Sequence, residues 1–281
     1  MPEIDPTVVV LTALALEYTA MRAHVVDREE LVHEDGTRVE RGRLEGTGWR
    51  VAIAELGEGA VNTAALTTQI LSWLRPQAVL FVGVAGSLKD DIGIGDVVVG
   101  TKVYGIQGGK QTPGGFLVRP EAWHSSNALV QAARSAVRDM ADVRAHFKPV
   151  AAGDVVLADA RSEIARHLRE NYNDAAAIET EGSGTAHAAH LNGQLDALVI
   201  RGISDLADAG KSKADVGGSQ ERAAARAAAV AVGVLRKHRP RADGRRAGSD
   251  GAAVYHGDHY DFRGGTFHAT VIAKSTGRQQ P

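Results

Sequence analysis

The chain of 281 residues is long enough for one or two domains with a sizeable buried core. Apolar residues make up 44% of the sequence and charged residues 23%, which excludes wholesale disorder, and the net charge of −2 gives no general attraction to nucleic acid or anionic membranes. Because the chain lacks cysteine, it has no disulfide, thiol nucleophile or cysteine metal site. The acidic N-terminus and the shortness of every apolar run lead us to expect a cytoplasmic protein without a membrane span.

Apolar, β-branched runs alternate with helical patterns along the first 238 residues, which predicts an α/β fold with a largely buried sheet. Strands are expected at 8–11, 78–82, 97–99, 155–157, 175–180 and 195–200, with a hairpin within 38–56. Helices are expected at 16–24, 61–74, 121–144 and 219–238, the last of them ending before Pro240.

The composition changes after residue 238. Residues 239–253 are mostly Arg, Asp, Gly, Ala and Ser, the composition of a linker, and residues 254–281 carry aromatic and β-branched side chains around Gly264-Gly265 that predict a small hairpin. Since an isolated two-stranded hairpin is marginal in water, we expect this tail to dock on a partner such as another protein. The predicted organisation is therefore a domain of residues 1–238, a linker of 239–253 and a tail of 254–281.

Carboxylates follow three of the predicted strands. Glu17 comes shortly after the first strand, Glu179 and Glu181 end the strand at 175–180, and Asp205 follows the strand at 195–200. Each position alone has a structural explanation, such as a residue in the first turn of a helix or a surface charge pair. Because ligands of α/β sheets bind beyond the carboxyl ends of the strands, the three positions together predict a site at one edge of the sheet.

Two histidine pairs are candidate metal ligands. His187 and His190 lie three residues apart, as do His256 and His259. Neither pair has a clear third ligand, so we predict no metal site.

Six short segments, taken in order and spacing, resemble the purine nucleoside phosphorylase superfamily. They are residues 13–17, 83–86, 95–98, 153–154, 179–181 and 203–208. Across residues 7–238 the chain most resembles the hydrolytic branch, the methylthioadenosine/S-adenosylhomocysteine nucleosidases, including nucleosidase domains fused to signalling proteins. The resemblance implies a central mixed β-sheet flanked by helices, a purine nucleoside as substrate, a homodimer whose partner chain closes the 5′ side of each pocket, and no cofactor.

The resemblance also implies roles for individual residues. Asp205 matches the general acid that protonates the purine at N7, Glu17 the group that deprotonates the attacking water, and Glu181 the group that binds the ribose hydroxyls. Arg201 and Ser204 match groups that position the water and the acid. The other residues expected to contact substrate are Val84, Ala85, Gly86, Val156, Leu157, Glu179 and Thr180, of which Val156 and Leu157 act through their backbone.

The chain departs from the nucleosidase pattern at several of these positions. Thr180 replaces a methionine, Val84 a serine and Val156 an aromatic residue, so the identity of the nucleoside and of its 5′ substituent stays open. The carboxylate of Glu17 would repel phosphate, which favours hydrolysis over phosphorolysis. The alternatives are a phosphorylase, an effector nucleosidase that cleaves nucleotides, and a sensor that binds nucleosides without turnover.

Overall fold

The computed structural model of the protein describes residues 6–193, 195–208 and 217–241. At the centre of its main sheet lie four parallel strands, β1 (Thr7–Thr12), β4 (Arg50–Glu55), β5 (Ala78–Ser87) and β12 (Asp196–Asp205). Their apolar runs are buried on both faces, as is usual for parallel strands. The carboxyl ends of these four strands therefore meet at one edge of the sheet.

The same sheet continues on both sides of this centre. Its other strands are β2 (Val25–Val32), β3 (Arg38–Leu44), β6 (Val97–Gly105), β9 (Glu121–His124), β10 (Ala145–Ala152) and β11 (Ala177–Glu179). In the described part of the chain the order is β11-β10-β6-β12-β5-β1-β4-β3-β2, with β9 paired to β6. Strand β11 also pairs antiparallel with β5, so β5, β12, β6, β10 and β11 form a closed ring of paired strands. This pairing places Ile178 opposite Gly86 and brings Glu179 to the carboxyl end of β5.

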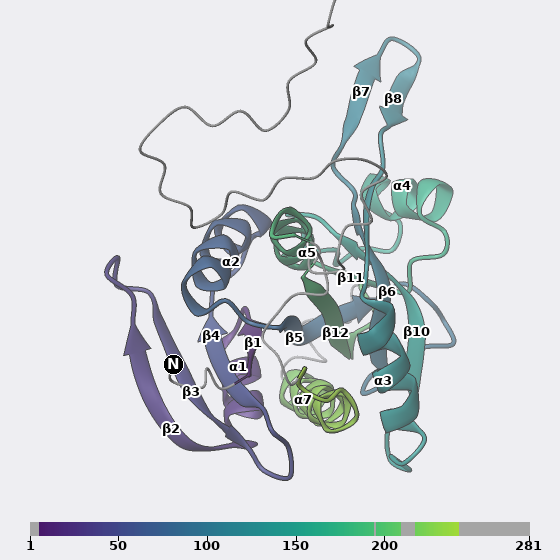
Figure 1. Ribbon diagram of the computed structural model, residues 1–281. Coiled ribbons are helices and arrows are strands. Elements are labelled where there is room, and N and C mark those ends of the chain that lie inside the picture. The colour runs from purple at the N-terminus through teal and green to yellow at the C-terminus, as the bar shows by residue number, and fades with distance from the viewer. Residues whose placement is uncertain (1–5, 194, 209–216, 242–281) are drawn as a thin grey trace, which may run out of the picture. The chain divides into compact units, whose positions relative to one another are not determined.

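Helices cover both faces of the sheet (Figure 1). One face carries α1 (Ala15–Arg22), α3 (Asn127–Val137) and α7 (Ser219–Lys237), and the other carries α2 (Ala60–Leu74) and α5 (Gly182–Leu191). Helix α4 (Glu163–Asn171) and the hairpin of β7 (Gly109–Thr112) and β8 (Gly115–Val118) complete the described elements. The arrangement confirms the expected α/β fold with a central mixed sheet between helices. No helix in the described ranges is long and apolar enough to cross a membrane.

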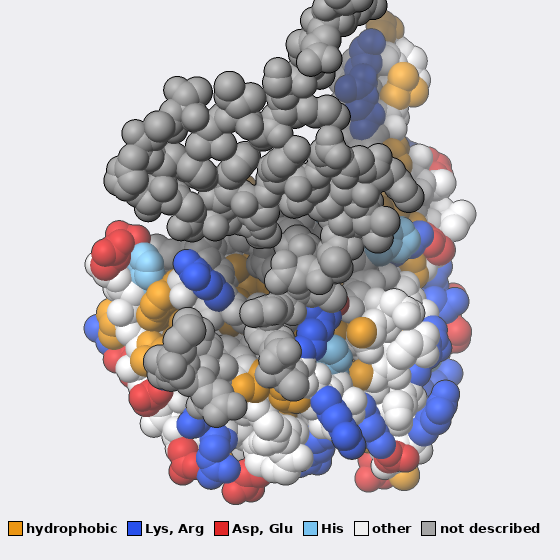
Figure 2. Space-filling view, in the orientation of Figure 1, with side chains coloured by type: hydrophobic (Ala, Val, Ile, Leu, Met, Phe, Trp, Pro, Cys, Tyr) orange, Lys and Arg blue, Asp and Glu red, His pale blue; other side chains and the backbone are white. Residues whose placement is uncertain are grey.

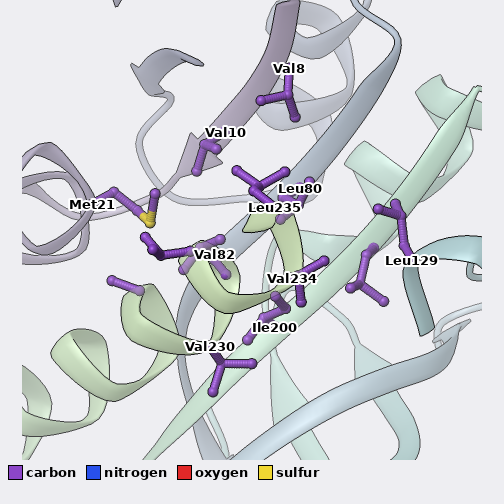
Figure 3. Close-up of a cluster of buried hydrophobic side chains, with 14 of the residues drawn as sticks. Val8, Val10, Met21, Leu80, Val82, Leu129, Ile200, Val230, Val234 and Leu235 are labelled. Carbon is purple, nitrogen blue, oxygen red and sulfur yellow. The ribbon is translucent and has the colours of Figure 1, made fainter. Parts of the chain in front are cut away.

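Helix α7 packs its apolar stripe onto the central strands (Figure 3). Val230, Val234 and Leu235 are fully or almost fully buried against side chains of β1, β5 and β12. Burial of each such side chain contributes about 1.5–3 kcal/mol. A Cβ at Gly202 of β12 would lie 2.0 Å from the carbonyl oxygen of Ala223, so the close contact between helix and strand requires glycine there.

The outer strands β2 and β3 carry a ladder of ion pairs. Each pair joins an acidic residue of β2 to an arginine of β3: Glu29 to Arg41, Glu30 to Arg38 and Asp27 to Arg43. Figure 2 shows the general pattern, with acidic and basic side chains interspersed along the lower edge of the view. Cross-strand charges of this kind discourage an exposed edge strand from pairing with other chains.

Two of the predictions of secondary structure are wrong. The helix expected at 121–144 is shorter, because residues 121–124 form β9 and place Trp123 opposite Val103 of β6 before α3 begins at Asn127. The strand expected at 155–157 is irregular, and the strand of this region is β10, whose burial comes from Val150, Ala151 and Ala152. Strand β2, the hairpin of β7 and β8, and helix α4 were not expected.

The C-terminal end of α7 is held beside the residues that precede β4 and β5. The indole Nε1 of Trp49 donates to the carbonyl of His238 at 2.7 Å, and the backbone N–H of Arg241 donates to Gln77 at 2.9 Å. The chain divides into two compact units, residues 1–244 and 245–281. The linker beyond residue 241 and the tail hairpin lie outside the described residues, so both stay predictions.

Candidate active site

A cavity of about 170 Å³ lies where the carboxyl ends of β1, β5, β11 and β12 converge. With the exception of Arg201, every site residue expected from the sequence lines it: Glu17, Val84, Ala85, Gly86, Val156, Leu157, Glu179, Thr180, Glu181, Ser204 and Asp205. Arg201 lies beneath the cavity and is fully buried. The structure thus brings together residues that are far apart in the sequence.

The carboxylate of Glu17 is held by backbone donors. Its Oε2 accepts hydrogen bonds from the N–H groups of Ala13 at 2.8 Å and Leu14 at 3.0 Å, and its Oε1 accepts one from the N–H of Val84 at 2.7 Å. The side chain is 2% exposed, and burial raises the pKa of this carboxyl although the charge of Arg201 and the three donors oppose the shift. A buried carboxylate with a raised pKa is a stronger base than one in water.

Arg201 supplies the positive charge beneath the carboxylates. It forms an ion pair with Glu179 and lies 3.9 Å from Oε2 of Glu181, and its guanidinium carbon lies 4.2 Å from the ring centre of Phe81. Its Nε and Nη1 atoms have no hydrogen-bond partner within the described residues. A Cβ at Gly83 would lie 2.1 Å from Nη1 and 2.5 Å from Oε1 of Glu17, so Gly83 leaves the space in which these two groups face each other.

Glu179 and Glu181 differ in their surroundings. The carboxylate of Glu179 accepts hydrogen bonds from the N–H groups of Glu181 and Gly182 as well as from Arg201. Burial raises the pKa of Glu179, and the Arg201 charge counters it. Glu181 accepts at Oε1 from the hydroxyl of Thr180 and from the N–H of Gly59 at 3.3 Å, at the N-terminus of α2. The positive end of that helix stabilises the negative charge of Glu181.

A β-bulge orients Asp205 at the end of β12. The register with β5 shifts between Ile203 and Asp205, which turns the carboxylate of Asp205 toward the cavity. Its Oδ2 accepts from the hydroxyl of Ser204 at 3.0 Å, and its Oδ1 accepts from the N–H of Ala207 at 2.8 Å. Ser204 therefore contacts Asp205 as expected from the sequence.

Two polar side chains that line the cavity were not among the site residues expected from the sequence. Glu58 lies in the Gly57-Glu58-Gly59 loop after β4, and Gln220 lies in the first turn of α7. The signal for Glu58 was available, because its loop follows an apolar strand in the same way as the segments that were singled out. Gln220 gave no comparable signal.

The described residues offer one close group of three possible metal ligands, His33, Glu34 and Asp35. These residues lie in the turn between β2 and β3, and none of them lines the cavity. His187 stacks on Trp123 with ring centres 5.2 Å apart, which gives it a role in packing.

The fold and this cavity define a known class of proteins. Residues 7–236 match the Phosphorylase superfamily, and the chain belongs to that family. A curated relative, the 5′-methylthioadenosine/S-adenosylhomocysteine nucleosidase of Chromohalobacter salexigens, is 30% identical over 209 residues, which cover 71% of this chain and 84% of the relative.

Solved structures show the same fold. The 5′-methylthioadenosine/S-adenosylhomocysteine nucleosidase of Neisseria meningitidis in complex with methylthio-immucillin-A has a TM-score of 0.72 at 24% identity, covering 82% of this chain and 98% of that one. The futalosine hydrolase of Helicobacter pylori has a TM-score of 0.71 at 23% identity, covering 82% and 97%.

Proposed function

We propose that this protein is a purine nucleoside N-ribohydrolase, which uses water to cleave the bond between an adenine-type base and ribose. The observation that carries the proposal is the convergence of Glu17, Glu181 and Asp205 from three separate strand ends in one small cavity. The curated relative, a nucleosidase that acts on methylthioadenosine and S-adenosylhomocysteine according to its name, supports the same chemistry.

Each carboxyl group has a task in this reaction. Glu17 takes a proton from water while the water oxygen forms a bond to C1′. The electron pair of the C1′–N9 bond moves to the base, and Asp205 gives a proton to N7 of the leaving purine. Glu181 binds the ribose hydroxyls, and its negative charge stabilises the cationic sugar of the transition state. The overall reaction converts the nucleoside and one water molecule into the free base and the free sugar.

The buried pair beneath the cavity positions these groups. Because the oxygens of Glu179 are engaged by Arg201 and by backbone N–H groups, we assign Glu179 to holding Arg201 and the start of α5 in place. Arg201 in turn presents donors on the side of Glu17, where they orient the water. The backbone of Val156 and Leu157 and the strand residues Val84, Ala85 and Gly86 complete the contacts proposed for the substrate.

The charges in the cavity favour hydrolysis over phosphorolysis. Five lining side chains are carboxylic, and no Lys, Arg or His lines the cavity in the described part of the chain. A phosphate ion needs cationic or N–H donors around it. Arg22 is the cation nearest in sequence to Glu17. Two of its nitrogens donate to Glu40, at 2.6 and 3.0 Å, so its charge is paired with Glu40 and not directed at the cavity.

The assembly and the cellular setting belong to the same proposal. We propose a homodimer whose second chain closes the 5′ side of each cavity, acting in the cytoplasm, with the tail of residues 254–281 available to a protein partner. The family membership supports the dimer, and the composition of the chain supports the location.

Release of free base from a panel of nucleosides tests the proposal. The panel contains methylthioadenosine, S-adenosylhomocysteine, adenosine, AMP and ATP, each assayed with and without phosphate, with chromatography of both the base and the sugar. We expect adenine and free sugar without phosphate. Dependence on phosphate with formation of a sugar 1-phosphate would make the protein a phosphorylase, and binding of an adenosine analogue without any base release would make it a sensor.

A further inference from the structure

We propose that Glu58 selects the 5′ substituent of the substrate, favouring nucleosides with a positively charged 5′ group and rejecting 5′-phosphates. This inference rests on the proposed function, since it assigns the sugar to the side of the cavity at which Glu181 lies. It concerns the loop between β4 and α2, which carries none of the residues singled out from the sequence.

The position of Glu58 follows from its neighbour in the chain. The N–H of Gly59 donates to Oε1 of Glu181, so the loop is fixed to the carboxylate that binds the ribose hydroxyls. The next residue, Ala60, donates its N–H to Asp154 at 3.2 Å and holds the start of α2 in place. Glu58 therefore lines the cavity at its sugar side, whereas Ser204 and Asp205 line it at the base side.

The substituent on C5′ is the part of the substrate that meets this residue. A cavity of about 170 Å³ has little room beyond a purine and a ribose ring, so a longer 5′ group must extend out of this cavity, toward the side that the second chain of the proposed dimer closes. Glu58 is exposed, unlike Glu17, Glu181 and Asp205, which are 2–5% exposed. It stands where the substrate leaves the buried part of the cavity.

Charge decides which 5′ groups are accepted there. The carboxylate of Glu58 has no hydrogen-bond or ion-pair partner within the described residues, so it is available to a ligand. Four further carboxylic side chains line the same cavity, and Arg201, which lies beneath it, is fully buried against Glu179. A 5′-phosphate would bring two negative charges into this field, while an ammonium group would gain a partner. Thr180, which is also polar, adds a hydroxyl rather than an apolar contact on this side.

Three adenine compounds differ in the charge that they carry at C5′: adenosine, 5′-amino-5′-deoxyadenosine and AMP. The first two are nearly equal in size, so the comparison between them isolates the charge. We measure kcat/KM for each with the wild type, Glu58→Gln and Glu58→Lys, at low and high salt. A matched control, Glu45→Gln, removes the same charge from an exposed position in the turn between β3 and β4, at the opposite end of β4 from the cavity.

We expect the wild type to prefer the amine over adenosine, and Glu58→Gln to lower that ratio about threefold to fivefold, the range of an exposed ion pair. Glu58→Lys should raise the ratio of AMP to adenosine by at least as much, and high salt should weaken every one of these differences. The Glu45→Gln ratios should equal those of the wild type.

The outcomes separate this inference from the proposed function. Base release from adenosine with ratios that neither Glu58 variant changes would overturn the role of Glu58 and leave the hydrolase in place. A wild type that hydrolyses AMP as well as the amine would also overturn it. Absence of base release from all three compounds and from methylthioadenosine, by a folded wild type, would overturn the proposed function itself.

Discussion

The contact between Glu17 and Arg201 can be tested through the glycine that separates them. In Gly83→Ala the new Cβ would lie 2.1 Å from Nη1 of Arg201 and 2.5 Å from Oε1 of Glu17, whereas ordinary contacts begin near 3.4 Å. Arg201 is fully buried and bound to Glu179, and Glu17 is held by three N–H groups, yet both contacts are too short, so both side chains must shift by about an ångström. Overpacking of this kind costs about 1–3 kcal/mol of stability, and a displacement of this size at a reacting group lowers turnover about 100-fold.

Base release and urea denaturation measure the two effects. The matched control is Gly93→Ala, since a Cβ at Gly93 meets no atom within 4 Å and the backbone there does not have a positive φ. We expect the control to retain both turnover and stability. A Gly83→Ala protein that turns over like Gly93→Ala would show that the placement of Glu17 relative to Arg201 does not matter, and the role given to Glu17 would fall with it.

Three further predictions concern the acid, the base and the end of the domain. Glu17→Gln should lower turnover by about 10²–10⁴-fold. Because burial raises the pKa of Glu17 above its ordinary 4.5, the activity of the wild type should begin to fall at a pH above 4.5 as the solution is made acidic, and this acidic limb should be absent in the variant. An unchanged rate or limb would exclude Glu17 as the base. Asp205→Asn should fold normally, because the hydroxyl of Ser204 can accept a hydrogen bond from the new amide. The variant should lose far more activity on a purine nucleoside than on a ribosyl nitrophenolate, whose leaving group needs no proton. Equal losses on the two substrates would make Asp205 structural. A chain ending after Arg241 should keep its fold and most of its turnover, as judged by thermal unfolding and base release, and an inactive but folded truncation would place part of the site in the tail.

The variants Glu17→Gln and Asp205→Asn differ in how well the new amide group fits its hydrogen-bond partners. All three hydrogen bonds of the Glu17 carboxylate come from backbone N–H groups, so the amide nitrogen of Gln must face a donor. Leaving one buried N–H unsatisfied costs about 1–3 kcal/mol. The stability of Glu17→Gln in urea therefore has to be measured along with its kinetics. In Asp205→Asn the amide can still bond to the hydroxyl of Ser204 and to the N–H of Ala207.

The buried strands could be predicted because they are continuous apolar runs. Val8–Leu11, Ala78–Val82 and the run before Asp205 are covered by helices on both faces, and no other structure accommodates such segments as well. Strand β2 could not be predicted in this way, because Asp27, Glu29 and Glu30 face solvent and its partner is charged as well. Residues 121–124 were included in a helix because the periodicity of α3 was extended past Ser126, and only the pairing of Trp123 with β6 separates the two elements.

The same distinction separates the site residues that could be predicted from the sequence from those that could not. Carboxylates that directly follow an apolar strand were found, since the carboxyl edge of a parallel sheet determines where they lie. The difference between Glu179 and Glu181 could not be seen in the sequence, because it depends on Arg201 reaching the first carboxylate and on Gly59 reaching the second. Glu58 follows the apolar strand β4 and could have been predicted by the same rule, but its position beside Glu181 depends on the hydrogen bond from Gly59.

The order of the strands has a consequence for how the protein is made. Strand β12 is the last strand along the described chain, yet it lies between β5 and β6, and without it the two halves of the sheet share only the short pairing of β11 with β5. A ribosome must therefore release more than 205 residues before the centre of the sheet can close, and the unpaired edges of β5 and β6 stay exposed until then. Unpaired strand edges are prone to aggregate, so the nascent chain is exposed to this risk until β12 has been made. An N-terminal piece that ends before β12 lacks the strand that joins the two halves of the sheet, so it cannot serve as a smaller folded version of the enzyme.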